Sequence, residues 1–310
     1  MARVFAFRGT DGRRHVGALD DRGVAVDLGP GEFVEWIRQA RLDGTWPSSL
    51  VAAHVAAAAA SSEADLAFDE TRATVGSGRM PLEVPLAAPE VWAAGVTYLR
   101  SREARQAETS ATTRDIYTRV YEAERPELFV KDSAGRRTVP SGGAVRVRSD
   151  STWSVPEPEL ALVVDAGGRI VGYTAGNDVS ARDIEGANPL YLPQAKVYRG
   201  SCALGPSVLL VDDAEPRTFR IELRVMGPDG GTIFEGSTGT DRMARALPDL
   251  VGALIRDNII DDGTVLLTGT GIVPPDAFRL AAGQRVEIRI EGIGLLWNSV
   301  EGGPAAFSPD

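Results

Sequence analysis

Short apolar runs separated by turn-forming residues dominate the chain and predict a protein rich in β-strands. Near the start, the pattern predicts strands at residues 2–7, 15–19 and 23–28 and helices at 32–42 and 48–60. Further strands are expected at residues 91–96, 144–148, 159–164, 170–175, 208–211, 220–225, 232–236, 265–267 and 286–290. Strands are therefore the main predicted element after residue 90.

Two helical stretches interrupt this pattern. Residues 242–258 have apolar positions on one stripe, which is more typical of a core-facing side than of a binding groove. Residues 100–124 are polar and compatible with a helix. Because glycines and prolines cluster just before residue 88, we place a soft boundary there. We expect an α+β protein with a small N-terminal α/β domain at 1–84 and a larger domain at 85–310.

Composition narrows the class of protein. The 310 residues are 43% hydrophobic and 25% charged, which is ordinary for a globular chain. A formal charge of −10 argues against nucleic acid as a partner. No window approaches the ~18 uncharged apolar residues of a membrane span, and the N-terminus lacks the pattern of a secretory signal. One cysteine, Cys202, cannot form an internal disulfide. We expect a cytoplasmic enzyme or binding protein.

Two residue types are scarce. Both histidines, His15 and His54, lie in the first fifth of the chain, so catalytic triads and His-rich zinc sites are excluded from the rest unless the early region folds into them. Lys131 and Lys196 are the two lysines among 33 basic residues. A position that keeps lysine can require a compact ammonium group with a tunable pKa, which arginine does not supply. Chance retention is an equally weighted alternative at this point.

The segment around Asp165-Ala-Gly-Gly has the sequence of a β-hairpin, because β-compatible runs flank a turn-forming tetrapeptide. If the turn is centred between Gly167 and Gly168, the numbers of opposed residues sum to 335. A turn that differs by one residue would reverse which side chains share a face.

This register brings three carboxylates together. Glu157 and Glu159 point to the same face of their strand, Glu157 lies opposite Asp178, and Glu159 is diagonal to it. Three converging carboxylates repel one another unless a cation lies among them. All-oxygen ligation suits Mg²⁺, Mn²⁺ or Ca²⁺ and disfavours zinc. The alternative is a solvated acidic face, which the apolar run that follows Glu159 makes less attractive.

Several spaced motifs over about residues 88–300 resemble the fumarylacetoacetate hydrolase family. They are Glu157-Pro-Glu159, Gly172-Tyr-Thr-Ala-Gly-Asn-Asp178-Val-Ser-Ala-Arg-Asp183, Thr268-Gly-Thr270-Gly and Gly283-Gln-Arg-Val-Glu-Ile-Arg-Ile-Glu-Gly-Ile-Gly294. The resemblance implies Glu157, Glu159 and Asp178 as ligands of Mg²⁺ or Mn²⁺, the same three residues that the hairpin brings together. It also implies a mixed β-roll catalytic domain and a homodimer or homotetramer.

Hydrolases and decarboxylases of that family typically carry a His-x-x-Glu pair after a G-x-N-Y-like motif. The matching stretch here, residues 95–105, has no histidine. Residues 121–131, 147–157 and 188–196 are instead similar to the 2-keto-3-deoxy-D-arabinonate dehydratase branch, and both lysines lie in these blocks. The resemblance implies a Mg²⁺-dependent hydro-lyase. Alternatives are an acylpyruvate hydrolase, an oxaloacetate decarboxylase, or a catalytically silent binding protein.

The chemistry of such a reaction sets what the site needs. A 2-keto acid can chelate one hard cation through its carboxylate and its ketone, and the cation stabilises the enolate that forms when a C3 proton leaves. Protonation of a C4 hydroxyl then lets water depart, so that 2-keto-3-deoxy-D-arabinonate would give 2,5-dioxopentanoate. Our candidates for the acid and the base are Glu127 and Lys196, with the direction of each proton transfer left open.

Four further residues are candidates for substrate binding. Thr270 could bind the substrate carboxylate in an anion-binding turn, or it could simply form a tight turn. Lys131 could bind the substrate carboxylate or pair with an acid of the metal site, and we favour the pairing slightly. Ser101 and Arg102, with Arg100, could form a lid over a polyhydroxy acid, although a solvated helix face explains them equally well.

Overall fold

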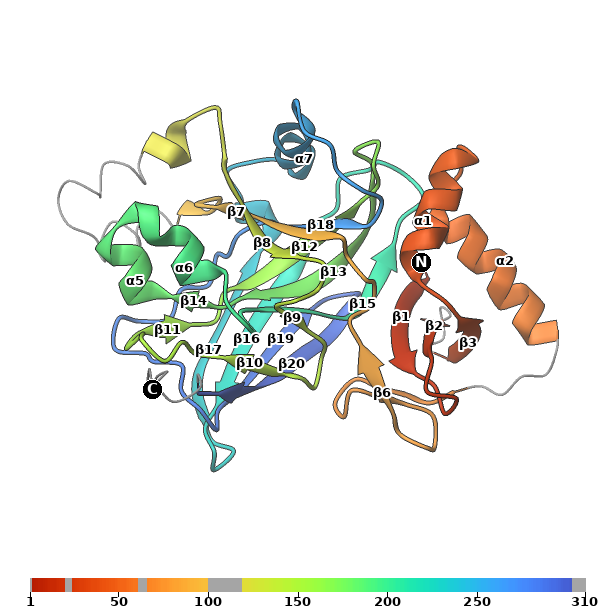
Figure 1. The fold of residues 1–310 in the computed structure, drawn as a ribbon, viewed down its shortest axis with the longest axis horizontal. Coiled ribbons are helices and arrows are strands. Elements are labelled where there is room, and N and C mark those ends of the chain that lie inside the picture. Colours follow the sequence, from red (N-terminus) through yellow and green to blue (C-terminus); the bar gives the residue numbers. More distant parts are fainter. Residues whose placement is uncertain (1, 20–23, 61–65, 100–118, 303–310) are drawn as a thin grey trace, which may run out of the picture.

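The computed structural model describes residues 2–19, 24–60, 66–99 and 119–302, and two β-sheets make up most of this part of the chain (Figure 1). The large sheet contains β1 (Arg3–Arg8), β2 (Arg14–Leu19), β3 (Ala25–Pro30), β4 (Phe68–Asp69), β5 (Thr74–Val75), β6 (Met80–Glu83), β7 (Glu90–Gly95), β8 (Glu127–Ser133), β9 (Thr138–Val139), β12 (Pro158–Val164), β13 (Ile170–Asp178), β15 (Cys202–Leu210) and β18 (Thr264–Leu267). The second sheet has the order β10 (Ala144–Arg146), β20 (Gly294–Glu301), β19 (Arg285–Ile290), β16 (Arg220–Met226) and β17 (Thr232–Gly239). A short pair joins β11 (Ser154–Val155) to β14 (Ser180–Ala181).

Helices cover the sheets at their margins. They are α1 (Phe33–Leu42), α2 (Pro47–Ala60), α5 (Arg182–Ala187), α6 (Leu192–Lys196) and α7 (Leu247–Ile255), with 3₁₀ turns at Pro189–Tyr191 and Thr240–Arg242. Among the described residues, no helix is both long enough and apolar enough to cross a bilayer.

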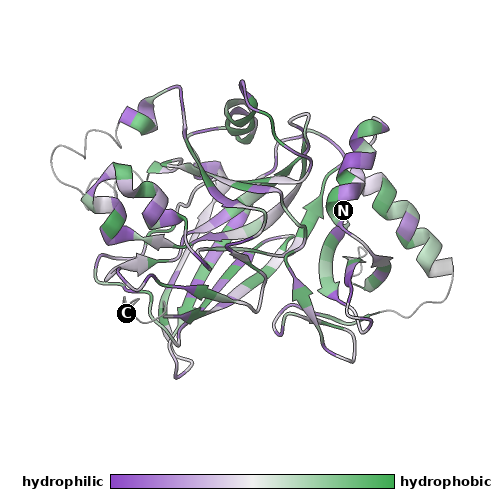
Figure 2. Ribbon diagram, viewed as in Figure 1, coloured by the Kyte–Doolittle hydropathy of each residue, from purple (hydrophilic) through white to green (hydrophobic). Residues whose placement is uncertain are grey.

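Strand β12 is buried on both faces, which explains its continuous apolar sequence. Leu160 and Leu162 belong to the core between the two sheets, whereas Ala161 and Val163 belong to a second core. That second core includes Phe33 of α1 and other residues of the N-terminal helices. Figure 2 shows many hydrophobic residues along the central strands and on α2. Side chains that alternate along a strand therefore fill two separate cores.

The predicted hairpin register is confirmed. In the ladder between β12 and β13, Pro158 pairs with Asn177 and Glu159 pairs with Gly176, so the residue numbers sum to 335. A bulge between Val163 and Val164 changes the pairing only beside the turn. The register is maintained elsewhere because a shift of one residue would exchange the contents of the two cores.

The N-terminal strands join the large sheet directly. β1 pairs with β15 through Arg3 opposite Leu209, and it also pairs with β2 and β6. Hydrogen bonding thus crosses the expected boundary near residue 84. The division into domains at 1–84 and 85–310 stays a prediction.

Most predicted strands match observed ones, but the helix expected at 242–258 is too long. It is confined to α7, and both Met243 and the residue before the helix, Ala246, have extended backbones. Pro248 in the first turn is tolerated, whereas a helix continued upstream would bring its ring against the carbonyl of Ala244. Met243 instead forms a β-bridge with Tyr98. In the predicted helical stretch 100–124, residues 119–122 are helical and residues 100–118 lie outside the described part.

One histidine of the N-terminal region provides a test by pH. His15 lies between Asp27 and Asp11, with its Nδ1 2.9 Å from Asp27 Oδ2 and its Nε2 3.2 Å from Asp11 Oδ1. Burial alone would lower the pKa of His15, but hydrogen bonds to the two aspartates and their charges raise it above the ordinary value of 6.5. The folded state therefore binds this proton more tightly than the unfolded state, and the added stability is lost as pH rises through the raised pKa.

We expect the substitution His15→Asn to destabilise the protein most below pH ~6.5, and progressively less as pH rises above that value. Urea unfolding of both proteins across this range measures the difference. If the difference in unfolding free energy between the two proteins did not change with pH, protonated His15 would not stabilise the fold through Asp27 and Asp11.

Candidate active site

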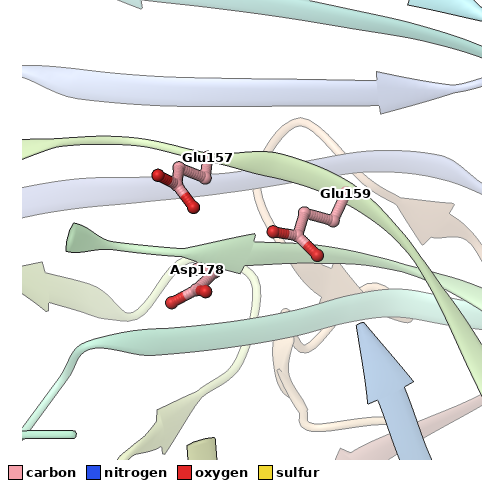
Figure 3. A group of neighbouring side chains, drawn as sticks. All are labelled: Glu157, Glu159 and Asp178. Carbon is pink, nitrogen blue, oxygen red and sulfur yellow. The ribbon is translucent and has the colours of Figure 1, made fainter. Parts of the chain in front are cut away.

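Three buried carboxylates meet at the open end of the β12–β13 hairpin, the end away from its turn (Figure 3). Glu157 precedes β12, Glu159 lies within it, and Asp178 ends β13. The Asp178 N–H donates to the carbonyl of Glu157 at 3.0 Å, which continues the predicted pairing by one residue. One ligand oxygen from each residue lies within 4.8 Å of the others, and the residues are 1–4% exposed. This burial excludes the alternative of a solvated acidic face.

Cationic side chains surround two of the three carboxylates. Lys196 Nζ lies 2.6 Å from Glu157 Oε2 and 3.0 Å from Asp178 Oδ2. Arg182 donates to Glu157 Oε1 at 2.8 Å, and Lys131 forms an ion pair with Asp178 Oδ1. Charge pairing thus positions the carboxylates of Glu157 and Asp178.

Glu159 is less well compensated. Its Oε2 accepts a hydrogen bond of 2.6 Å from the backbone N–H of Gly269. Burial raises the pKa of Glu159 well above its ordinary value, and repulsion from Asp178 and Glu157 adds to this, while Lys196 and the Gly269 N–H lower it less. Ionisation of the Glu159 carboxyl is therefore unfavourable in this site, and a further positive charge, such as a bound cation, would stabilise the carboxylate.

The residues present fit a hard divalent cation. Carboxylate oxygens are the ligands that Mg²⁺ and Mn²⁺ prefer, and three of them converge here. They line a cavity of about 20 Å³ together with residues such as Glu127 and Lys196, and this volume can hold one ion or water molecule. We therefore refer to Glu157, Glu159 and Asp178 as the acidic trio.

Lys131 lies behind the acidic trio rather than in the cavity wall. It is fully buried, donates to the carbonyl of Val179 at 3.1 Å, and also donates to the carbonyl of Lys196. Lys131 therefore ties the end of β13 to α6. Of the two alternatives drawn from sequence, this position favours pairing with an acid of the metal site over contact with a substrate.

Glu127 lies in the cavity wall on β8, opposite Gly95 of β7. A Cβ atom at Gly95 would lie 2.0 Å from Glu127 Oε2, so the absence of a side chain at Gly95 lets the carboxylate of Glu127 occupy this position. Glu127 and Lys196 line the same cavity as the acidic trio, and their roles as acid and base stay a prediction.

We expect Gly95→Ala to displace the Glu127 carboxylate while leaving the fold intact, because the clash involves the far end of a flexible side chain. Turnover should fall about 100-fold, the lower end of the contribution of one acid or base group, with Mg²⁺ binding unchanged. Gly78→Ala is the control, since Gly78 faces open space in an exposed turn. Normal turnover in Gly95→Ala would show that the position of Glu127 does not matter.

Thr270 also lines the cavity, and its side chain belongs to a tight turn. Its Oγ1 donates to the carbonyl of Ile272 at 3.3 Å and accepts from the Ile272 N–H at 3.2 Å. Both sequence-based interpretations of Thr270 are compatible with this placement. Ser101 and Arg102 lie outside the described residues.

Three residues of the site were missed from sequence. Arg182 and Glu185 of α5 are buried in the cavity wall, and Gly269 supplies the N–H that holds Glu159. The signal for Arg182 is its place in the string that follows Asp178. The signal for Gly269 is the Thr-Gly-Thr-Gly turn, whose anion-binding groups were expected to face a substrate carboxylate rather than Glu159.

The fold and the site define a β-roll protein with a buried, all-oxygen candidate site for a divalent cation. The sequence model described as "Fumarylacetoacetate (FAA) hydrolase C-terminal" matches residues 90–301. The chain belongs to the fumarylacetoacetate hydrolase family.

Individual relatives are similar over most of their length. A "Probable 2-keto-3-deoxyxylonate dehydratase" of Haloferax volcanii is 50% identical over 218 residues, which cover 70% of this chain and 74% of that protein. A "2-dehydro-3-deoxy-D-arabinonate dehydratase" of Saccharolobus solfataricus is 46% identical over 220 residues, with 70% and 73% covered. The solved structure described as "2-keto-3-deoxy-D-arabinonate dehydratase complexed with magnesium and 2,5-dioxopentanoate" is 33% identical, covers 97% of this chain and 99% of that one, and has a TM-score of 0.78.

Proposed function

We propose that this protein is a Mg²⁺-dependent hydro-lyase that converts 2-keto-3-deoxy-D-arabinonate to 2,5-dioxopentanoate. The observation that carries the proposal is the meeting of the acidic trio, Glu127 and Lys196 in one cavity. Relatives at 46–50% identity with names of this activity support it. A neighbour at 33% identity, described with magnesium and 2,5-dioxopentanoate, supports both the cofactor and the product.

The two names of the relatives describe the same kind of substrate. In a 2-keto-3-deoxy pentonate, C2 is a ketone and C3 is a methylene, so the differences between arabinonate and xylonate at these carbons are lost. For the D series, both names denote one compound with a single stereocentre at C4. The proposal therefore specifies one pentonate skeleton rather than two.

Conversion to 2,5-dioxopentanoate requires several proton transfers. A C3 proton and the C4 hydroxyl leave as water. One proton from C5 and the proton of its hydroxyl must then be lost, and one proton must be added at each of C3 and C4, so that C5 becomes an aldehyde. When bound, a divalent cation polarises the 2-keto group and stabilises negative charge on its oxygen. Glu127 and Lys196, which both line the cavity, accept and donate these protons. Arg182 and the buried Lys131 keep the carboxylates oriented.

The environment of Lys196 suits this role. Its Nζ contacts two carboxylates, lies 5.8 Å from the ring centre of Phe129, and is largely excluded from solvent. An ammonium group held this way is positioned to protonate a leaving hydroxyl without a shift of the backbone. Glu127, which lines the same cavity from β8, supplies the basic partner.

The family resemblance also supports a cytoplasmic homodimer or homotetramer with a small-molecule 2-keto acid as substrate. Size-exclusion chromatography with light scattering tests the assembly. A mass equal to one chain would contradict it.

The activity is tested with a panel of 2-keto-3-deoxy acids, an acylpyruvate and oxaloacetate, each with and without EDTA. We expect dehydration of the 2-keto-3-deoxy pentonate, loss of that activity in EDTA, and recovery on adding Mg²⁺. Release of pyruvate from the acylpyruvate, or decarboxylation of oxaloacetate as the main reaction, would contradict the proposal in favour of the alternatives raised by the sequence.

A further inference from the structure

Glu185 is a buried carboxylate of the active-site cavity with no part in the proposed reaction. It lies on the short helix α5, is 4% exposed, and lines the cavity together with the acidic trio, Glu127 and Lys196. Its Oε2 lies 3.9 Å from the Nε of Arg182, one turn earlier on the same helix. Because Glu185 adds negative charge to the wall of a binding cavity, it affects which ligands the cavity accepts.

The cationic side chains of the cavity wall already contact carboxylates of the protein. Lys196 Nζ lies within 3.0 Å of carboxylate oxygens of both Glu157 and Asp178. Arg182 lies between Glu157 and Glu185. Among the described residues that line the cavity, Lys196 and Arg182 are the two with a positive charge. A ligand carboxylate that reached this wall would therefore compete with protein carboxylates for them.

The charges of the site balance when a divalent cation is bound. Five carboxylates line the cavity, namely the acidic trio, Glu127 and Glu185. Three cationic side chains contact carboxylates of this group, namely Lys131, Lys196 and Arg182. One divalent cation would bring this part of the site to neutrality. A chelating 2-keto acid then makes it negative, and a second carboxylate on the same ligand would add further like charge.

The rest of the cavity wall suits an uncharged tail. Its other side chains are apolar or small, with Val96, Phe129 and Val273 among them. Hydroxyl groups of a ligand can donate hydrogen bonds to the carboxylates of Glu127 and Glu185, whereas a ligand carboxylate can only accept. The cavity thus offers acceptors to a polyhydroxy tail and repels an anionic one.

We propose that Glu185 is a specificity-determining residue, which restricts the site to 2-keto acids with an uncharged tail and rejects 2-keto dicarboxylates. This inference rests on the proposed function, because it takes the acidic trio as the place where the cation and the keto-acid end bind. A site can discriminate between ligands of similar shape by placing a repelling charge against the wrong one. Glu127 adds to this repulsion from the same cavity.

Two unreactive acids with five carbons form a matched pair of probes. Both 2-oxopentanoate and 2-oxoglutarate have the chelating keto-acid end and lack a hydroxyl at C4. They differ at C5, which is a methyl group in the first and a carboxylate in the second. Calorimetric titration of the Mg²⁺-loaded wild type should show at least ~10-fold tighter binding of 2-oxopentanoate. Equal affinity for the two acids, or tighter binding of 2-oxoglutarate, would overturn the proposal.

Glu185→Gln tests whether this preference comes from one residue. The substitution keeps the shape of the side chain and removes its charge, so the affinity for 2-oxoglutarate should rise at least ~3-fold relative to that for 2-oxopentanoate. A purely structural defect would weaken the binding of both acids alike and leave the preference unchanged, which would overturn the role of Glu185. Glu291→Gln, in the exposed turn between β19 and β20, is the control and should keep the wild-type preference. Glu185→Met gives the same test if Glu185→Gln does not fold.

Failure of the specificity and failure of the proposed function give different results. Dehydration of the 2-keto-3-deoxy pentonate, together with equal binding of the two probe acids, would overturn the specificity alone. A preference for 2-oxopentanoate without any dehydration would overturn the proposed function and leave a cation-dependent site for 2-keto monocarboxylates. Binding of neither acid to the Mg²⁺-loaded protein would overturn both.

Discussion

Glu159→Gln is expected to abolish turnover and the stabilisation by Mg²⁺ together. The substitution keeps the shape of the side chain and its hydrogen bond from Gly269, but it removes one of three negative charges. The rate should fall by about 10³-fold or more, because charge stabilisation by the cation is lost. For the wild type, a cation present at 100 times its Kd stabilises the fold by about 2.7 kcal/mol, and the variant should lose most of this gain.

The same variant should behave differently without the cation. Because burial and its acidic neighbours raise the pKa of Glu159, the ionised side chain destabilises the folded state near neutral pH. A neutral glutamine relieves this cost, so the metal-free variant should unfold at the same temperature as the wild type or at a higher one. Thermal unfolding with EDTA and with Mg²⁺ measures both effects.

Glu222→Gln is the control for the charge change, since Glu222 lies half-buried on the second sheet, away from the acidic trio, and pairs with Arg220. It should leave turnover and stabilisation by Mg²⁺ unaltered. Stabilisation of Glu159→Gln by Mg²⁺ to the same extent as the wild type would contradict the role of the acidic trio.

Lys196→Met is expected to lose turnover by about 10²–10⁴-fold while Mg²⁺ still binds. The ammonium group of Lys196 lies within 3.0 Å of both Glu157 and Asp178, so it competes with a cation for their charge. Its removal should leave the affinity for Mg²⁺ unchanged or raise it. Steady-state kinetics measure turnover, and calorimetric titration measures the affinity for Mg²⁺. Near-normal turnover in Lys196→Met would contradict the role of Lys196 in proton transfer.

The other lysine provides the matched comparison. Lys131→Met removes a fully buried cation from Asp178 and from two backbone carbonyls. Breaking a buried ion pair in this way typically costs about 3–5 kcal/mol of stability. We expect this variant to be strongly destabilised, as measured by chemical unfolding. Full stability in Lys131→Met would show that the residue does not support the site.

The hairpin that carries the acidic trio could be predicted from sequence because two independent constraints agree on its register. The Asp-Ala-Gly-Gly turn sets the pairing, and the two cores that β12 separates hold it. A bulge beside the turn did not alter the alignment at Glu159, since the cores lie between the bulge and the site. The local sequence was therefore sufficient to predict the register of this hairpin.

Contacts between distant segments could not be predicted in the same way. Lys131 and Lys196 were noticed because they are rare, yet nothing local shows that one lies behind Asp178 and the other in the cavity. The different positions of the two lysines depend on how α6, which carries Lys196, lies against β8, which carries Lys131, and against Asp178 of β13. The extended backbone at Met243 is a similar case, because its bridge to Tyr98 comes from a segment 145 residues away.

The central claim is that Glu157, Glu159 and Asp178 together hold a divalent cation. A crystal grown with Mn²⁺, measured near the manganese absorption edge, tests it directly. We expect one strong anomalous peak per chain, in direct bonding contact with a carboxylate oxygen from each of the three residues, and no such peak in Glu159→Gln crystals. A peak elsewhere, or an acidic trio occupied by Lys196 alone at saturating Mn²⁺, would contradict the account.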